Sequence, residues 1–257
     1  MLRTFLIQAE LAWEQPESNM LRLEQYIHPL SCNADLILLP EMFNSGFTMR
    51  PESVAEPMDG PTMQWMRRMA SATDAVVTGS LVIERDGHYH NRLVWMRPDG
   101  DYRYYDKRHL FGLAGENSHY VPGNQRCIFE WRGWRIFPLI CYDLRFPVWS
   151  RRSEHFDYDL LLYVANWPER RREAWQRLLP ARAIENQCYV AAVNRIGPDG
   201  NGITHAGDSI LLDYMGAPIV SPMDAAGGFG QTLDLEKLRS YRKDFPFWQD
   251  ADGFAFL

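Results

Sequence analysis

Three segments of the sequence end a strand-like apolar run in a side chain that can take part in catalysis. The segments are "LILLPE", "YRYYDK" and "WRIFPLIC", and the last residues of the three are Glu41, Lys107 and Cys141. In open α/β sheets, binding sites form beyond the carboxyl ends of the strands. The sequence therefore predicts that a carboxylate, an ammonium group and a thiol converge on one pocket.

Together these three groups would supply the parts of a covalent catalytic site. A thiol becomes a nucleophile when a base or a nearby positive charge favours its thiolate form. Glu41 could be that base, Lys107 could stabilise an oxyanion, and Cys141 could attack. Each residue also has a structural interpretation: a buried thiol in a core, a carboxylate in a turn and a charge on the surface. Their joint occurrence favours the catalytic interpretation.

The elements that would position these groups alternate along the chain. Residues 17–30 and 60–73 have the apolar spacing of helices, whereas 34–40, 75–84 and 134–140 are typical of strands. Later segments repeat the alternation, with strands expected at 157–166, 188–197, 206–216 and 228–235 and a hairpin within 90–110. Residues 169–187 are helical in pattern, and Pro180 predicts a kink or a junction of two helices there. We expect a single α/β domain over 1–257, with the aromatic tail 241–257 packed on the body or on a second subunit.

Composition excludes several classes of protein. The formal net charge is −6, and the run Arg170–Arg172 is flanked by Glu169 and Glu173, so we expect a solvated helix start and no nucleic-acid partner. No apolar run reaches the length of a membrane helix, and the first ten residues are too short and too polar for a signal peptide. The four cysteines form no C-x-x-C pair. These features predict a cytoplasmic protein with reduced thiols.

Several segments carry a family resemblance. "LLPEMFNSGF", "YDKRHLF" and "LICYDLRFP" resemble the signature segments of the nitrilase, or carbon–nitrogen hydrolase, superfamily, and "NWP", "ARAIENQCYVAAVNR" and "GDSILLD" extend the match over nearly the whole chain. Within the superfamily the chain is most similar to the omega-amidases, particularly the bacterial 2-oxoglutaramate amidases. The resemblance implies a four-layer αββα sandwich and a homodimer or higher homo-oligomer. It implies no metal and no organic cofactor.

The resemblance also implies a mechanism. The catalytic Glu, Lys and Cys of the family fall on Glu41, Lys107 and Cys141, and its second glutamate falls on Glu116, the acidic residue of the loop "GLAGENSHYVPG". A thioester on Cys141 is expected, with the backbone N–H of Tyr142 as an oxyanion donor.

The resemblance to the omega-amidases implies a small-amide substrate, specifically a short ω-amide of a 2-oxo dicarboxylic acid such as 2-oxoglutaramate or 2-oxosuccinamate. Arg145 is the candidate partner of the substrate carboxylate, with Arg108 as its competitor, because a guanidinium can bind a carboxylate with two hydrogen bonds. Arg145 could instead hold the Cys141 turn through Asp143. Phe43, Phe111 and Trp167 are the expected pocket walls because they adjoin the motifs. We therefore take Arg145, Phe43, Phe111 and Trp167 as the candidate substrate-binding residues.

Other functions stay open at this point. Another branch of the same superfamily would give a deaminated-glutathione amidase or a nitrile hydrolase. A metal-dependent hydrolase could use His88 and His90, which would share one face of a strand, although no complementary ligand motif occurs elsewhere in the sequence. A catalytically silent binding protein would not need the intact set of Glu41, Lys107 and Cys141.

Overall fold

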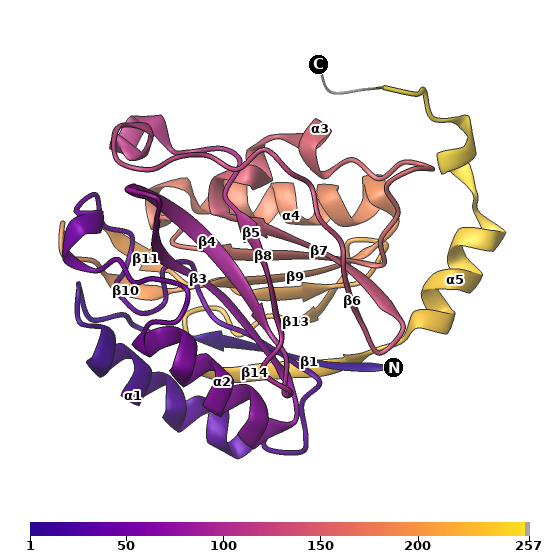
Figure 1. Ribbon diagram of the computed structural model, residues 1–257. Helices are drawn as coiled ribbons and strands as arrows, with labels where there is room; N and C mark the ends of the chain where they lie inside the picture. The colour runs from indigo at the N-terminus through magenta and orange to yellow at the C-terminus, as the bar shows by residue number, and fades with distance from the viewer. Residues whose placement is uncertain (255–257) are drawn as a thin grey trace.

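Two six-stranded sheets pack face to face in the computed structural model, which describes residues 1–254, and helices cover the outer face of each sheet (Figure 1). The strand order of the first sheet is β14, β1, β2, β3, β4 and β5, in which β1, β2 and β3 are parallel and the other neighbours are antiparallel. Its strands are β1 Leu2–Gln8, β2 Leu36–Leu38, β3 Val76–Arg85, β4 His88–Met96, β5 Tyr102–Asp106 and β14 Gly227–Leu233.

The second sheet has the same arrangement. Its order is β13, β12, β9, β8, β7 and β6, with β7, β8 and β9 parallel and the remaining pairs antiparallel. A separate hairpin of β10 and β11 follows β9. The strands are β6 Phe129–Trp131, β7 Trp134–Ile140, β8 Leu160–Ala165, β9 Tyr189–Asn194, β10 Ile196–Pro198, β11 Thr204–Ala206, β12 Ile210–Leu212 and β13 Pro218–Val220.

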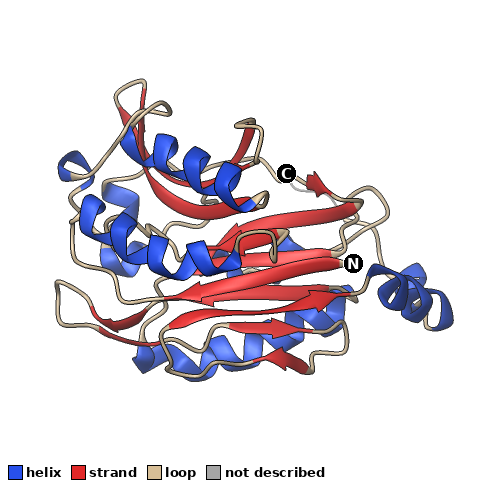
Figure 2. Ribbon diagram, turned by 90° about the horizontal axis from the view of Figure 1, so that it is seen from below, coloured by secondary structure: helices blue, strands red, loops and turns tan. Residues whose placement is uncertain are grey.

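The helices form the two outer layers, and α5 stands at one edge of the sandwich (Figures 1 and 2). Pro16 and Pro61 begin α1 and α2, where a missing N–H costs nothing. The α-helices are α1 Pro16–Ile27, α2 Pro61–Thr73, α3 Pro147–Ser150, α4 Arg172–Asn186 and α5 Leu235–Asp244. Short 3₁₀ helices are η1 His28–Leu30, η2 Pro51–Ser53, η3 Gly112–Ala114, η4 Glu116–Ser118, η5 Cys141–Arg145, η6 Glu169–Arg171 and η7 Phe247–Asp250.

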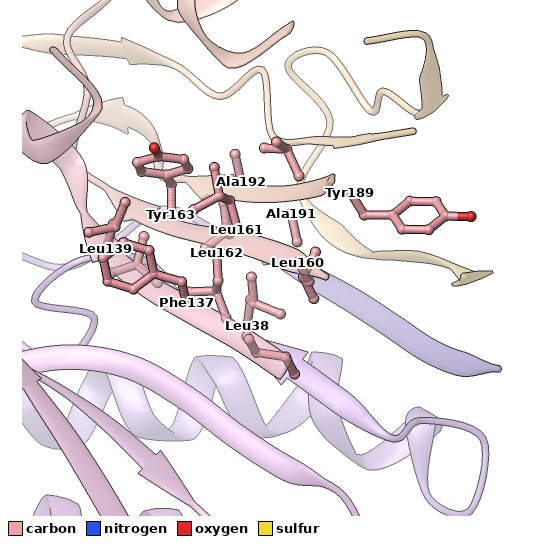
Figure 3. Packing of buried hydrophobic residues seen from close by; sticks show 14 of the residues in the cluster. Leu38, Phe137, Leu139, Leu160, Leu161, Leu162, Tyr163, Tyr189, Ala191 and Ala192 are labelled. Carbon is pink, nitrogen blue, oxygen red and sulfur yellow. The ribbon is translucent and has the colours of Figure 1, made fainter. Parts of the chain in front are cut away.

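The core lies between the sheets and beneath the helices, because the central strands are buried on both faces. In β2 and the residue after it, Leu36 and Leu38 belong to the cluster between the two sheets, whereas Ile37 and Leu39 pack with α1 and α2 on the outer face. This division follows from the two-residue period of a strand. Figure 3 shows residues of β2, β7, β8 and β9 within the central cluster. The expected four-layer α/β sandwich is confirmed.

One of the two alternatives predicted for Pro180, a junction of two helices, is wrong, and the other, a kink, stays a prediction. Pro180 lies inside α4, which runs as one element from Arg172 to Asn186, and not at a junction of two helices. Residues on both sides of the proline, Trp175, Leu179 and Ala183, belong to the central hydrophobic cluster. Their packing outweighs the loss of one helical hydrogen bond.

The tail is held to the body mainly through α5. Arg242 donates to the carbonyl of Tyr158 at 2.6 Å and lies 3.3 Å from Asp159, and Gln187 donates to the carbonyl of Phe245 at 2.7 Å. Beyond α5, Phe245 is 54% exposed, whereas Phe247 and Trp248 are half-buried and the guanidinium carbon of Arg152 lies 5.1 Å from the centroid of the Trp248 ring. The predicted tail extends to 257, and its last three residues lie outside the part of the chain that the structure describes.

Candidate active site

The predicted catalytic groups do meet at the ends of their strands. Glu41 follows β2, Lys107 directly follows β5, and Cys141 directly follows β7 as the first residue of η5. The Nζ atom of Lys107 lies 2.8 Å from Glu41 Oε1, and Lys107 and Cys141 line the same cavity. Both charged groups act on the Cys141 thiol: Glu41 raises its pKa and Lys107 lowers it. The two sheets therefore bring together residues that are 100 positions apart in the sequence.

Lys107 is the centre of a buried cluster of charges. Its ammonium group donates to Glu41 Oε1 at 2.8 Å and to both carboxylate oxygens of Glu116, at 3.0 and 2.9 Å. Glu41 and Glu116 are fully buried, and Lys107 is 1% exposed. Glu116 also accepts the backbone N–H of Phe111 at 2.5 Å, which fixes the loop around η4. Buried charges of this kind are tolerated when they are paired and hydrogen-bonded.

Two asparagines that the sequence did not predict orient these carboxylates. Asn91 of β4 donates to Glu41 Oε1 at 2.8 Å and to Glu116 Oε1 at 3.2 Å. The backbone N–H of Asn166 donates to Glu41 Oε2 at 2.8 Å, and its side-chain amide donates to the Glu41 carbonyl. Asn166 directly follows the apolar strand β8, so the strand-end pattern could have identified it. Asn91 lies within a strand, and nothing in the sequence marks it.

Cys141 sits in a sharp turn at the end of β7. Its φ angle is +42°, a left-handed conformation that is uncommon for a residue with a side chain. Asp143 holds the turn: its Oδ2 accepts the N–H of Ile140 at 3.0 Å and the hydroxyl of Tyr105 at 2.8 Å, and its Oδ1 accepts the N–H of His109 at 3.0 Å. The turn is thus fixed by Asp143 without an ion pair to Arg145 among residues 1–254.

Electrostatics keep the Cys141 thiol protonated at rest. Burial raises the pKa of Cys141 well above its usual range, and the charge of Glu41 raises it further, while Lys107 opposes the shift. Burial alone would lower the pKa of Lys107, but the attraction of Glu116 and Glu41 outweighs it and the net shift is upward. Lys107 therefore stays charged, and Cys141 needs a base to become a thiolate.

A cavity of about 260 Å³ opens beside the Cys141 side chain. Phe111 and Trp167 line it, as predicted, and the residue Tyr142 that was proposed as the oxyanion donor lines it as well. The N–H of Tyr142 belongs to the first turn of η5, where backbone donors have no partner within the helix.

Phe43 was expected in the wall and requires a correction. It is fully buried in the outer core, with its ring centroid 5.6 Å from that of Trp65, and Phe47 takes the wall position instead. Gly79 makes room for Phe43 there, because a Cβ atom on that glycine would lie 2.8 Å from the Phe43 ring. The turn after Glu41 therefore directs Phe43 towards α2, away from the cavity.

Arg145 lines the cavity, whereas its competitor Arg108 does not. The guanidinium carbon of Arg145 lies 4.9 Å from the centroid of the Trp167 ring, within the range of a cation–π contact. Arg108 donates to the carbonyl of Gly123 at 3.3 Å and lies over Trp149, away from the cavity.

The two histidines considered for a metal site do not form one. Within residues 1–254, no group of three or more His, Cys, Asp or Glu side chains is arranged to hold a metal ion. His88 is exposed, and Nδ1 of His90 lies 4.0 Å from Asp106, which is engaged by Arg92 at 2.6 Å. The same part of the chain contains no helix that is both long and apolar enough to span a membrane.

Comparison with known proteins defines the class to which this site belongs. A model of the carbon–nitrogen hydrolase family matches residues 4–243, and the chain belongs to that family. It is a hydrolase that acts on carbon–nitrogen bonds other than peptide bonds, and the resemblance noted in the sequence is confirmed.

Individual relatives are similar over their whole length. The omega-amidase YafV of Escherichia coli strain K12 is 46% identical over 255 residues, which cover 98% of each chain. A 2-oxoglutaramate amidase of Bacillus subtilis strain 168 is 31% identical over 249 residues, 95% of each chain. The crystal structure of XC1258 from Xanthomonas campestris, a CN-hydrolase superfamily protein with an arsenic adduct in its active site, is 43% identical, with a TM-score of 0.97 over 100% of this chain and 99% of that one.

Proposed function

We propose that this protein is an omega-amidase that releases ammonia from short ω-amides of 2-oxo dicarboxylic acids, with 2-oxoglutaramate and 2-oxosuccinamate as substrates. The observation that carries the proposal is that Cys141 and Lys107 line one small cavity, with the Glu41 carboxylate 2.8 Å from Lys107 and close enough to Cys141 to raise the pKa of its thiol. Relatives that are 46% and 31% identical bear the names omega-amidase and 2-oxoglutaramate amidase.

Acylation begins with proton transfer from the Cys141 thiol to Glu41. The thiolate attacks the amide carbon, and the electron pair of the carbonyl moves onto its oxygen. Lys107 and the backbone N–H of Tyr142 stabilise that oxyanion, and one such fixed donor contributes roughly 3–4 kcal/mol in other enzymes. When the oxyanion collapses, the carbon–nitrogen bond breaks and Glu41 returns the proton to the departing nitrogen. Ammonia leaves, and a thioester remains on Cys141.

Deacylation uses Glu41 in the same order, first as a base and then as an acid. Glu41 accepts a proton from a water molecule, and the resulting hydroxide attacks the thioester carbon. The carbon–sulfur bond breaks, the acid is released, and the proton on Glu41 returns to Cys141. Glu116 contributes by positioning this water together with Glu41. Its two hydrogen bonds to Lys107, at 3.0 and 2.9 Å, also keep the ammonium group directed at the oxyanion.

Arg145 supports the choice of an anionic substrate. It lines the cavity four residues after Cys141, and within residues 1–254 it lies more than 4 Å from any carboxylate oxygen. A free guanidinium at the cavity wall can bind the carboxylate end of the substrate through two hydrogen bonds while the amide end lies at Cys141. We expect Arg145→Ala to lower kcat/KM for 2-oxoglutaramate about tenfold to a hundredfold, the effect of losing a hydrogen bond to a charged group. Pentanamide, an uncharged amide, should lose much less, and equal losses would assign Arg145 a structural role.

An ammonia-release screen over a panel of amides tests the function. The panel should hold 2-oxoglutaramate, 2-oxosuccinamate, deaminated glutathione and a short nitrile, assayed with the wild type and with Cys141→Ala. We expect the highest kcat/KM on the two ω-amides and no turnover by Cys141→Ala. Preference for deaminated glutathione or for the nitrile would move the protein to another branch of the superfamily. Turnover by Cys141→Ala would overturn the mechanism.

A further inference from the structure

Three arginines line the cavity without a carboxylate partner. Arg145, Arg170 and Arg171 all contribute to its wall, and in the described chain none has a carboxylate oxygen within 4 Å. Their neighbour Arg172 is different, because it binds Asp208 with two hydrogen bonds of 2.6 and 2.8 Å. Asp199, the carboxylate in the cavity wall, accepts the backbone N–H groups of 201 and 203 through its Oδ1. The cavity therefore has an excess of positive charge.

Arg171 is the member of this set whose placement points to a ligand. Its Nη1 atom is buried and has no hydrogen-bond partner within residues 1–254. Its guanidinium carbon lies 5.1 Å from the centroid of the Phe111 ring, and the indole N–H of Trp167 donates to its carbonyl at 2.8 Å. Burial lowers the pKa of Arg171, and the charges of Arg170 and Arg145 lower it further. A bound anion would relieve both the missing hydrogen bond and this repulsion.

Two of these arginines, Arg145 and Arg171, each lie beside an aromatic ring of the cavity wall. The guanidinium carbon of Arg145 lies 4.9 Å from the centroid of the Trp167 ring, and that of Arg171 lies 5.1 Å from the centroid of the Phe111 ring. Within residues 1–254 neither guanidinium has a carboxylate partner, so the N–H groups of both can bind a planar acceptor. A 2-oxo acid presents only acceptors at this end, two carboxylate oxygens and the adjacent oxo oxygen. An α-amino acid presents an ammonium group there, which two guanidinium groups would repel.

We propose that Arg171 is a second binding residue for the 2-oxo acid end of the substrate, and that with Arg145 it selects 2-oxo acid amides against α-amino acid amides. The proposal rests on the proposed omega-amidase function and extends it to substrate selection. The sequence had predicted a solvated helix start for Arg170–Arg172, so this assignment depends on the tertiary structure.

The test compares Arg171→Met with Arg170→Met on three amides: 2-oxoglutaramate, glutamine and pentanamide. Both variants lose one charge at the same cavity, but Arg170 is exposed. For Arg171→Met we expect kcat/KM on 2-oxoglutaramate to fall about tenfold to a hundredfold, mainly through KM, with a change below about threefold on pentanamide. The preference for 2-oxoglutaramate over glutamine should fall by a similar factor. Arg170→Met should change each value by less than about threefold.

Two results would overturn the assignment. One is an equal loss on 2-oxoglutaramate and pentanamide, and the other is an equal loss in the Arg170→Met and Arg171→Met variants. Melting temperatures of both variants identify a folding defect.

Binding of the product 2-oxoglutarate gives a readout independent of turnover. It is measured as protection of Cys141 from alkylation, and the half-protecting concentration should rise at least about tenfold in Arg171→Met. If the wild type does not cleave 2-oxoglutaramate, the omega-amidase proposal fails, and this protection assay still decides whether Arg171 binds a 2-oxo acid. Equal protection of the wild type and Arg171→Met would overturn the assignment in that case as well.

Discussion

Replacing Lys107 with Met would leave two buried carboxylates without the cation they share. Glu41 and Glu116 are fully buried and lie 2.8 and 2.9 Å from Lys107 Nζ. Removing one partner of a buried ion pair costs roughly 3–5 kcal/mol, because a charge is left uncompensated. For a chain of this size, about 2–4 °C of melting temperature corresponds to 1 kcal/mol. We therefore expect Lys107→Met to melt about 6–20 °C below the wild type at pH 7.5.

The loss of stability in Lys107→Met should grow as the pH rises. Burial raises the pKa of Glu116, and Lys107 partly opposes that shift. Without Lys107 the folded protein holds the Glu116 proton to a higher pH, whereas the unfolded chain releases it near the ordinary pKa of about 4.3. The folded variant then binds more protons than the unfolded one across that window, so its stability falls as pH rises through it. The difference in melting temperature between Lys107→Met and the wild type should be larger at pH 8 than at pH 5.5.

Thermal unfolding followed by circular dichroism at pH 5.5, 7.5 and 8 measures both effects. Lys237→Met, which removes an exposed lysine of α5, is the matched control and should have the same melting temperature as the wild type. The double variant Lys107→Met/Glu116→Gln should recover part of the lost stability, because one uncompensated charge is removed. A melting curve of Lys107→Met that matches the wild type, or a loss that does not change with pH, would refute the reasoning.

Three further predictions concern the nucleophile, its base and the tail. Cys141→Ala should abolish ammonia release and keep the wild-type circular dichroism spectrum. Cys32→Ala, which removes an exposed thiol, should retain full activity. The reverse pattern would show that Cys141 is not the nucleophile. Glu41→Gln should lower kcat roughly 10²–10⁴-fold because the base is lost. The same variant should speed alkylation of Cys141 by iodoacetamide at pH 8, because Glu41 raises the pKa of that thiol. Slower alkylation than in the wild type would contradict this explanation. Deleting 241–257 removes the contacts of Arg242 with Tyr158 and Asp159, so the melting temperature should fall or the elution volume should change, and constancy of both would show that the tail is dispensable.

Local sequence was sufficient for features that depend on a residue's place in one element. Apolar runs identified the buried parallel strands β2 and β7, which precede Glu41 and Cys141, and these residues meet Lys107, which follows the antiparallel strand β5. This works because β5 runs in the same direction as β2, so that the carboxyl ends of both strands lie at one edge of the first sheet. The family resemblance supplied what periodicity could not, which was the pairing of two sheets into four layers and the identity of Glu116.

Other features were decided only when the two halves of the chain packed together. Phe43 and Phe47 both follow Glu41 by a few residues, and the space beside Gly79 determines that Phe43 enters the core while Phe47 reaches the cavity. Pro180 stays within α4 because residues on both sides of it pack into the central cluster. Neither outcome has a local signal, since each depends on the shape of a neighbouring element.

The charged groups of the site show most clearly which features the sequence determines and which depend on the tertiary structure. The sequence by itself determined which residues end the strands β2, β5 and β7, because apolar runs and their polar ends are written in the order of the chain. Only the tertiary structure decided that Asn91 reaches the carboxylates of Glu41 and Glu116. It also decided that Arg171, which its acidic neighbours in the sequence had seemed to balance, lines the cavity without a carboxylate partner. The physical reason is that pairing of charges and burial of a donor depend on distances in space, which neighbours in sequence do not fix.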